Sequence, residues 1–142
     1  MADKDQSFIL PDRAGALASY PHARRVGDLI FVSGISSRRP DNTHEGVTID
    51  SDGTVHKDIR EQTRAVLRNI DVILKAAGSG IEDVVDITVF LVDMSDYKGM
   101  NEIYNTFFKA ATGPTRTTVA VHQLPHPNLL VEMKAVAHAP VG

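Results

Sequence analysis

The sequence contains no cysteine and no tryptophan, and only 6% of its 142 residues are aromatic. Without cysteine, the chain has no disulfides, no thiolate metal ligands and no thiol nucleophile. Few aromatic rings are available to stack on nucleic-acid bases. The formal net charge of -3 also gives no sign of a basic footprint for a phosphate backbone. We therefore expect no nucleic-acid partner.

Long apolar runs are missing as well. No stretch approaches the ~18 apolar residues that a membrane-spanning helix needs, and the first residues lack the apolar core of a signal peptide. We therefore expect a cytoplasmic protein that makes no membrane contact. His122 and His126 are four residues apart, but a strand leading into a proline-rich loop does not place them on one helical face. We expect no metal site.

The apolar periodicity predicts seven elements in a single domain spanning residues 1–142. After residues 8–10, which form at most an edge strand, come two strands at 22–26 and 29–33 joined across Gly27-Asp28, a helix at 59–77 and a strand at 84–93. A helix from Ser95 or Asp96 to Gly113-Pro114 and strands at 115–123 and 129–138 complete the seven. The stretch 35–56 shows no period and is predicted to be an unusually long loop.

The first helix has the clearest boundaries. Asp58 can cap its start, with Glu61 three residues later, and Gly78 can stop it. The polar face of this helix carries four basic residues, which we interpret as a solvated surface: Arg60, Arg64, Arg68 and Lys75.

The order of the elements predicts an α+β domain with both helices on one face of a sheet. The strand at 84–93 is apolar on both faces, which predicts a central strand covered on both sides. Two helices cover only one face of such a sheet. We therefore expect the open face to be buried by self-association, which predicts a homo-oligomer.

Two charged residues near the C-terminus suggest a ligand site. Arg116 follows a Gly-Pro break at the start of an alternating strand, and its guanidinium is suited to binding a carboxylate. Glu132 lies within an apolar strand, where an acid needs a partner or a function. The alternatives are a surface arginine on an edge strand and a structural ion pair, including one between these two residues.

A simple strand geometry relates the two residues. If the last two strands form a hairpin closed by residues 124–128, residue 116 faces roughly residue 136, and residue 120 faces roughly residue 132. Arg116 and Glu132 then share one face of the sheet, on the order of 13 Å apart at ~3.3 Å per residue. A small ligand would fit between them.

The chain resembles a known family in two motifs: Pro114-Thr115-Arg116, and Val131-Glu132-Met133-Lys134-Ala135 in the next strand. With the layout of both helices, these motifs resemble the Rid (YjgF) family of enamine/imine deaminases across essentially the whole chain. The resemblance implies a chorismate-mutase-like fold, in which a single mixed sheet carries two helices on one face. It also implies a homotrimer packed through the sheets, with a hexamer as a further possibility, and cofactor-free active sites in the clefts between subunits.

The resemblance also implies roles for individual residues. Arg116 would bind the substrate carboxylate and Glu132 would position a water. Tyr20, Ser33-Gly34 and Asn101 would complete the pocket, although the Gly-Pro that usually precedes the tyrosine is absent here. Two further substrate-binding candidates are Thr118, which stands where many members carry cysteine, and His22, which is placed near Tyr20 to assist proton transfer.

Within the family, the stretches 33–42 and 115–127 resemble the 2-aminomuconate deaminase branch. This implies hydrolysis of 2-aminomuconate, an enamine dicarboxylate, to 4-oxalocrotonate and ammonia in aromatic or tryptophan-type catabolism. We hypothesise that Arg38 or Arg39 binds the second carboxylate. Two alternatives stay open. One is a general 2-aminoacrylate/2-iminopropionate deaminase, and the other is a non-catalytic binding or protective module on the same fold.

Overall fold

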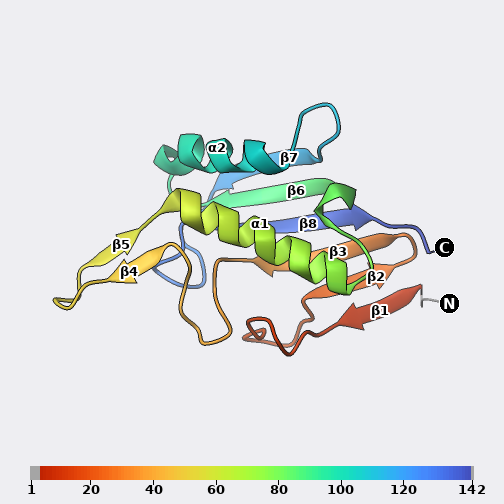
Figure 1. Cartoon of the computed structure of the whole chain (residues 1–142), viewed down its shortest axis with the longest axis horizontal. Helices are drawn as coiled ribbons and strands as arrows, with labels where there is room; N and C mark the ends of the chain where they lie inside the picture. Colours follow the sequence, from red (N-terminus) through yellow and green to blue (C-terminus); the bar gives the residue numbers. More distant parts are fainter. Residues whose placement is uncertain (1–3, 142) are drawn as a thin grey trace.

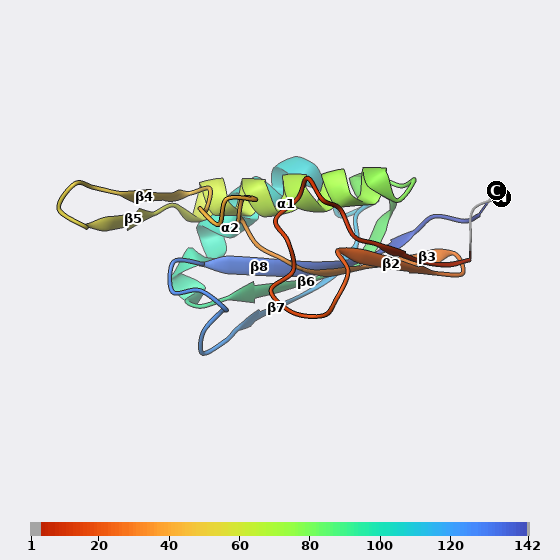
Figure 2. The same ribbon diagram turned by 90° about the horizontal axis from the view of Figure 1, so that it is seen from below.

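A computed structural model describes residues 4–141 and shows two helices packed on one face of a mixed six-stranded sheet (Figures 1 and 2). The strand order is β1-β2-β3-β8-β6-β7, in which only β6 and β7 run parallel. The sheet strands are β1 (Asp5–Phe8), β2 (Ala23–Val26), β3 (Leu29–Ile35), β6 (Val84–Leu91), β7 (Thr115–Ala120) and β8 (Val131–His138). The helices are α1 (Ile59–Ala76) and α2 (Tyr97–Phe107). The predicted α+β class is confirmed.

Local sequence signals account for the first elements. Gly27 has φ +60 in the two-residue turn that joins β2 to β3, as the Gly-Asp pair predicts. Asp58 caps α1, because its side chain accepts hydrogen bonds from the backbone N–H groups of Arg60 and Glu61. Gly78, with φ +84, follows the end of the helix.

The core lies between the helices and the covered face of the sheet. The buried face of α1 packs on the inward residues of the central strands, which are fully or almost fully buried: Ile30, Val32, Ile87, Val89, Leu91, Val131, Met133, Ala135 and Ala137. Alternate residues of the same strands point to the opposite face, which no element of the described chain covers (Figure 2). Within residues 4–141, β6 is therefore covered on one face only, and the cover expected on its other face through self-association stays a prediction.

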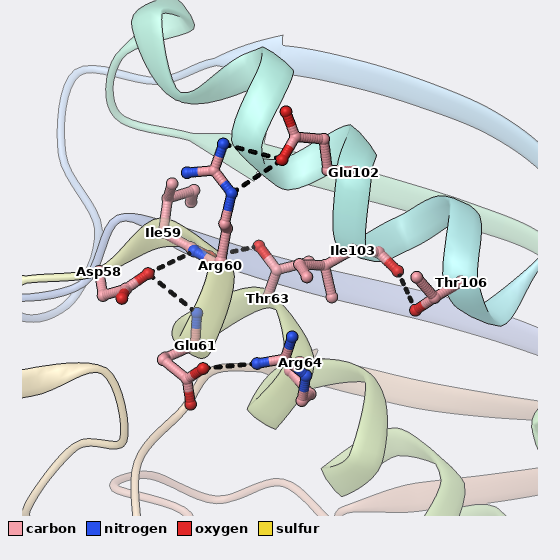
Figure 3. A network of polar contacts seen from close by, with 9 residues as sticks. All are labelled: Asp58, Ile59, Arg60, Glu61, Thr63, Arg64, Glu102, Ile103 and Thr106. Atoms are coloured by element: carbon pink, nitrogen blue, oxygen red, sulfur yellow. Dashed lines mark hydrogen bonds and ion pairs between the residues drawn. The ribbon is translucent and has the colours of Figure 1, made fainter.

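Polar contacts join the two helices at one end (Figure 3). Arg60 of α1 forms an ion pair with Glu102 of α2 at 2.8 Å, and Arg64 pairs with Glu61 one turn away. Lys75 pairs with Asp71 at 2.9 Å. Arg60, Arg64 and Lys75 thus form surface ion pairs, as expected for the solvated face of a helix.

The stretch 35–56 contains a short β-hairpin, so its prediction as one long loop was wrong in part. β3 extends to Ile35, a turn closed by a bridge between Arg38 and His44 follows, and β4 (Val47–Ile49) pairs with β5 (Val55–Lys57). Figure 2 shows this hairpin projecting from the body of the domain. Its strands have three residues each, which is too short to show a period. The Asp52-Gly53 pair in its turn is a hairpin signal that the prediction missed.

The predicted hairpin of the last two strands is also wrong. β7 pairs with β6 in parallel, and β8 pairs with β6 from the other side, so β6 separates them. The chain forms a β6-α2-β7 crossover unit, the usual way to join parallel neighbours.

Some boundaries differ by a few residues. β1 starts earlier than the predicted edge strand at 8–10. A short 3₁₀ turn (Met94–Asp96), capped by Asp93, precedes α2, which ends at Phe107, before Gly113-Pro114. Within the described residues, no helix is long and apolar enough to cross a membrane.

Candidate active site

Glu132 lies on the open face of the sheet. Its neighbours Val131 and Met133 are fully buried against the helices, so alternation points Glu132 the other way. Its side chain is half-buried and makes no hydrogen bond or ion pair with any of residues 4–141. Burial raises the pKa of this carboxyl above its usual value. A carboxyl of this kind can accept a proton from, or return it to, a bound ligand.

An irregularity in β3 places Ser33 and Gly34 beside Glu132. The register between β3 and β8 shifts between Val32 and Ile35, so β3 carries one extra residue opposite β8. A Cβ atom built on Gly34 would lie 3.2 Å from both Cδ and Oε2 of Glu132. Because glycine has no Cβ atom, the Glu132 carboxyl can occupy this position without a close contact to residue 34.

The predicted pocket residues Tyr20, Ser33 and Gly34 meet Glu132 in one groove of about 550 Å³. The Ser33 hydroxyl donates a hydrogen bond to the carbonyl of Pro21 at 2.7 Å and so fixes the segment that carries Tyr20. Tyr20 itself is about half exposed (48%). Arg24 and Lys134 also line the groove, and Arg24 forms an ion pair with Asp5 at 3.1 Å.

His22 is buried and lines a neighbouring cavity of about 410 Å³, not the groove that contains Glu132. Its Nδ1 accepts a hydrogen bond from the backbone N–H of Leu10 at 3.1 Å, and its Nε2 lies 2.8 Å from the carbonyl of Ala14. The ring thus holds the N-terminal segment in place with both nitrogens.

Arg116 lies in a second cluster, at the edge strand β7 and under α2. Its guanidinium donates hydrogen bonds to Asn101 Oδ1 at 2.8 Å and to the Tyr97 hydroxyl at 3.1 Å. It also lies 4.6 Å from the centre of the Tyr104 ring, within the range of a cation–π contact. These partners are neutral, so they orient the guanidinium without neutralising its charge. Arg116 forms no ion pair with a carboxylate of residues 4–141.

Thr118 lies two residues further along β7, on the same face as Arg116. Its Oγ1 is buried and has no hydrogen-bond partner within the described chain. Buried hydroxyls are seldom left unpaired, so this atom is available to a ligand or a water. The structure therefore groups Arg116 with Asn101 and places Thr118 on the same face of β7, whereas their role in substrate binding stays a prediction. It adds Tyr97 and Tyr104, which sequence reasoning missed as partners of Arg116.

Arg116 and Glu132 lie on opposite faces of the sheet, so the predicted shared face was wrong. Arg116 is the register partner of Ile87, which is fully buried under the helices. Glu132 is the register partner of Phe90, which points to the open face. The reason is the strand order, since the prediction paired β7 directly with β8. One copy of the chain thus carries the Arg116 cluster on one face of the sheet and the Glu132 groove on the other. We call these two clusters the half-sites.

The open face around Glu132 is partly apolar. Phe31, Leu29, Val26 and Val119 are 36 to 47% exposed, and Val136 lies beside Phe31 in the register of β3 and β8. An apolar patch with charged residues at its margin is typical of a protein–protein interface.

The turn that carries Arg38 and Arg39 is well bonded. The guanidinium of Arg38 donates to the carbonyl of Gly15 and to Asn42 Oδ1, and Arg39 donates to Thr43 Oγ1 at 3.2 Å. Both arginines line a cavity of about 410 Å³ that also touches Tyr20, Ser33 and Gly34. Arg13 and Arg68 line the same cavity, and sequence reasoning missed both in this role.

Comparison with known proteins identifies the family. The sequence profile of the family described as Endoribonuclease L-PSP matches residues 11–139. The chain belongs to the Rid (YjgF) family. It is 38% identical over 122 residues to a RutC family protein of Pyrococcus abyssi, covering 86% of this chain and 87% of that one.

Two further comparisons concern one bacterial Rid protein. The chain is 33% identical to the putative reactive intermediate deaminase TdcF of Escherichia coli, over 87% of this chain and 88% of the relative. The crystal structure of E. coli TdcF with bound serine superposes with a TM-score of 0.76 at 29% identity, covering 94% of this chain and 98% of that chain. These comparisons confirm the predicted family and fold.

Proposed function

We propose that this Rid protein is a hydrolytic deaminase of enamine/imine acids, with 2-aminomuconate as its substrate. The observation that carries the proposal is Glu132. It is a half-buried carboxyl of raised pKa, without a partner in the described chain, beside the bulge at Gly34 in an open groove. The E. coli relative TdcF, named a putative reactive intermediate deaminase, supports the same class of chemistry.

The reaction needs little from the protein. An enamine tautomerises to the imine by protonation at carbon, and the imine carbon is then electrophilic. Water adds to this carbon and the resulting amino alcohol expels ammonia, which leaves the 2-oxo acid. The protein has to hold the acid, aim the water and move protons, for which positioned acid–base groups typically contribute about 10² to 10⁴-fold.

Glu132 is the residue placed to move the protons. In its ionised form it takes a proton from the attacking water, and its raised pKa lets it return that proton to the leaving nitrogen. Tyr20 and Ser33 line the same groove and border the substrate.

Arg116 is the residue placed to bind the carboxylate next to the reacting carbon. Asn101 and Tyr97 hold its guanidinium in a fixed orientation, and its charge is not neutralised by an acid of the described chain. Thr118 offers an unpaired hydroxyl on the same face. A planar guanidinium fixed in this way suits bidentate binding of a carboxylate.

The opposite orientation of the two half-sites supports a site shared between copies. In a homotrimer, the Arg116 cluster of one copy lies against the Glu132 groove of the next, and the apolar open face is buried between them. Each closed ring of three then carries three complete clefts.

The test is ammonia release by the purified protein from freshly generated 2-aminomuconate and, side by side, from 2-iminopropionate. We expect release from 2-aminomuconate that is lost in Arg116→Ala and in Glu132→Gln. Release only from the small imine would identify a general imine deaminase. No release from either substrate would contradict the enzyme and favour a binding module.

A further inference from the structure

A cavity of about 410 Å³ lies between the N-terminal segment, the turn at 36–45 and helix α1. This volume falls within the range of about 300 to 1,000 Å³ that is usual for small-molecule sites. Its charged lining is strongly basic and consists of Arg13, Arg38, Arg39, Arg68 and a single acid, Glu45. The whole chain has a formal net charge of -3, so this concentration of positive charge is local.

Within the described residues, the four arginines lack ion-pair partners, although the charge of Arg39 interacts with that of nearby Asp41. Within residues 4–141, none of them forms an ion pair with a carboxylate, whereas Arg60 and Arg64 on the same helix as Arg68 both do. Clustered guanidinium groups repel one another, and an anionic ligand removes that repulsion.

The arginines differ in how many donors they have free. Arg38 is committed, because it donates to the carbonyl of Gly15 and to Asn42. Arg13 has a buried Nε without a partner in the described chain, and its only side-chain bond is a long one of 3.5 Å to Asn69. Within the described residues, the side chain of Arg39 donates only to Thr43, at 3.2 Å. The pKa of nearby Asp41 is lowered by its hydrogen bonds with Thr43 and, to a smaller extent, by the charge of Arg39.

Arg68 completes the set. It is exposed, and its side chain makes no hydrogen bond with the described residues, although Asp71 lies three positions on. The carboxylate of Asp71 is taken by Lys75 and by the backbone N–H of Ile81. Arg13, Arg39 and Arg68 therefore have guanidinium donors to offer, and Arg38 holds the turn and the N-terminal segment together.

The cavity adjoins the groove that contains Glu132. Tyr20, Pro21, Ser33 and Gly34 line both spaces. A ligand whose reacting carbon lies at Glu132 therefore has the basic cavity within reach of its other end.

We propose that this cavity binds the distal carboxylate of an extended dicarboxylate substrate. Arg13, Arg39 and Arg68 are its donors, and Arg38 is a positioning residue. The inference rests on the proposed deaminase function and assigns the length and the second charge of its substrate to a defined part of the fold. It also explains why a small monocarboxylate imine would use only part of the space.

The test is binding, measured by calorimetry, of two stable six-carbon probes. Hexa-2,4-dienedioate carries a carboxylate at each end, and hexa-2,4-dienoate carries one. We expect the diacid to bind the wild-type protein more tightly than the monoacid. Three single variants remove one donor each: Arg13→Gln, Arg39→Gln and Arg68→Gln. Each should weaken the affinity for the diacid about 10- to 100-fold, the range typical of a lost charge-assisted hydrogen bond, and leave the affinity for the monoacid unchanged.

Arg64→Gln is the matched control, because Arg64 lies one turn before Arg68 on α1 and outside the cavity. It should change neither affinity. Arg68→Lys keeps the positive charge but loses the paired N–H donors of the guanidinium. It should therefore retain more of the diacid affinity than Arg68→Gln does.

The failure of this inference is distinct from failure of the proposed function. If 2-iminopropionate is hydrolysed but the arginine variants bind the diacid as the wild type does, the cavity is not the carboxylate site. If binding of the diacid depends on the arginines but no imine is hydrolysed, the proposed deaminase function and its substrate are contradicted. The cavity would then be a diacid-binding site without that activity. Equal affinity for diacid and monoacid in the wild-type protein would overturn the inference directly.

Discussion

Replacing Gly34 by alanine tests whether the position of the Glu132 carboxyl controls the reaction. The new Cβ would lie 3.2 Å from Cδ and Oε2 of Glu132, a few tenths of an ångström inside ordinary contact. The Glu132 side chain has room to give way toward the groove, so the carboxyl is displaced by about that amount. A misplacement of ~1 Å can cost about 100-fold in rate, so we expect kcat to fall about 3- to 10-fold.

The same substitution should leave the fold intact. Gly34 does not adopt a positive φ, so alanine fits its backbone. Alanine also restricts the unfolded chain, a stabilising effect of about 0.4 to 1 kcal/mol that offsets the close contact. The assay is initial-rate ammonia release, with the melting temperature measured in parallel.

Gly15→Ala is the matched control, because a Cβ at Gly15 meets nothing within 4 Å. It should leave kcat unchanged. Wild-type kcat in Gly34→Ala would refute the idea that the carboxyl needs this position, and a large drop in melting temperature would show that Gly34 is needed for folding instead.

Three further predictions concern stability. Asp58→Ala removes the cap of α1 and should lower the free energy of unfolding by about 1 kcal/mol, measured in urea; an unchanged midpoint would contradict the capping role. Gln62→Leu should cost about 1 to 3 kcal/mol, because buried Gln62 accepts from the Leu130 N–H and donates to the Asn128 carbonyl; a cost near zero would mean that water replaces both bonds. Burial lowers the pKa of His44, so its neutral form is favoured on folding, and stability should fall as the pH drops below about 6.5. A His44→Gln variant with the same pH slope as the wild type would assign that loss to other groups.

Local signals predicted the elements that local chemistry decides. The turn at Gly27, the cap at Asp58 and the stop at Gly78 each depend on neighbouring residues, and all three are confirmed. The family motifs around Arg116 and Glu132 were also visible in the sequence, because they are short and contiguous.

Local sequence signals did not determine which strands are neighbours in the sheet. Nothing in the residues of β7 specifies that its neighbour is β6 rather than β8, since alternation fixes which residues share a face but not which strand lies beside it. One wrong neighbour placed Arg116 and Glu132 on the same face. The basic cavity was missed for a similar reason, because Arg13 and Arg68 are 55 positions apart and meet only in the fold.

The measurement that tests the shared cleft most directly is complementation between two inactive variants. Arg116→Ala and Glu132→Gln chains are co-expressed with different affinity tags, and complexes carrying both tags are purified. In a mixed ring of three copies, one of the three clefts joins an intact Arg116 to an intact Glu132, so ammonia release should recover to about one third of the wild-type rate. Recovery to this level is the result we predict. Release no higher than that of either variant alone would mean that the two residues do not meet across copies.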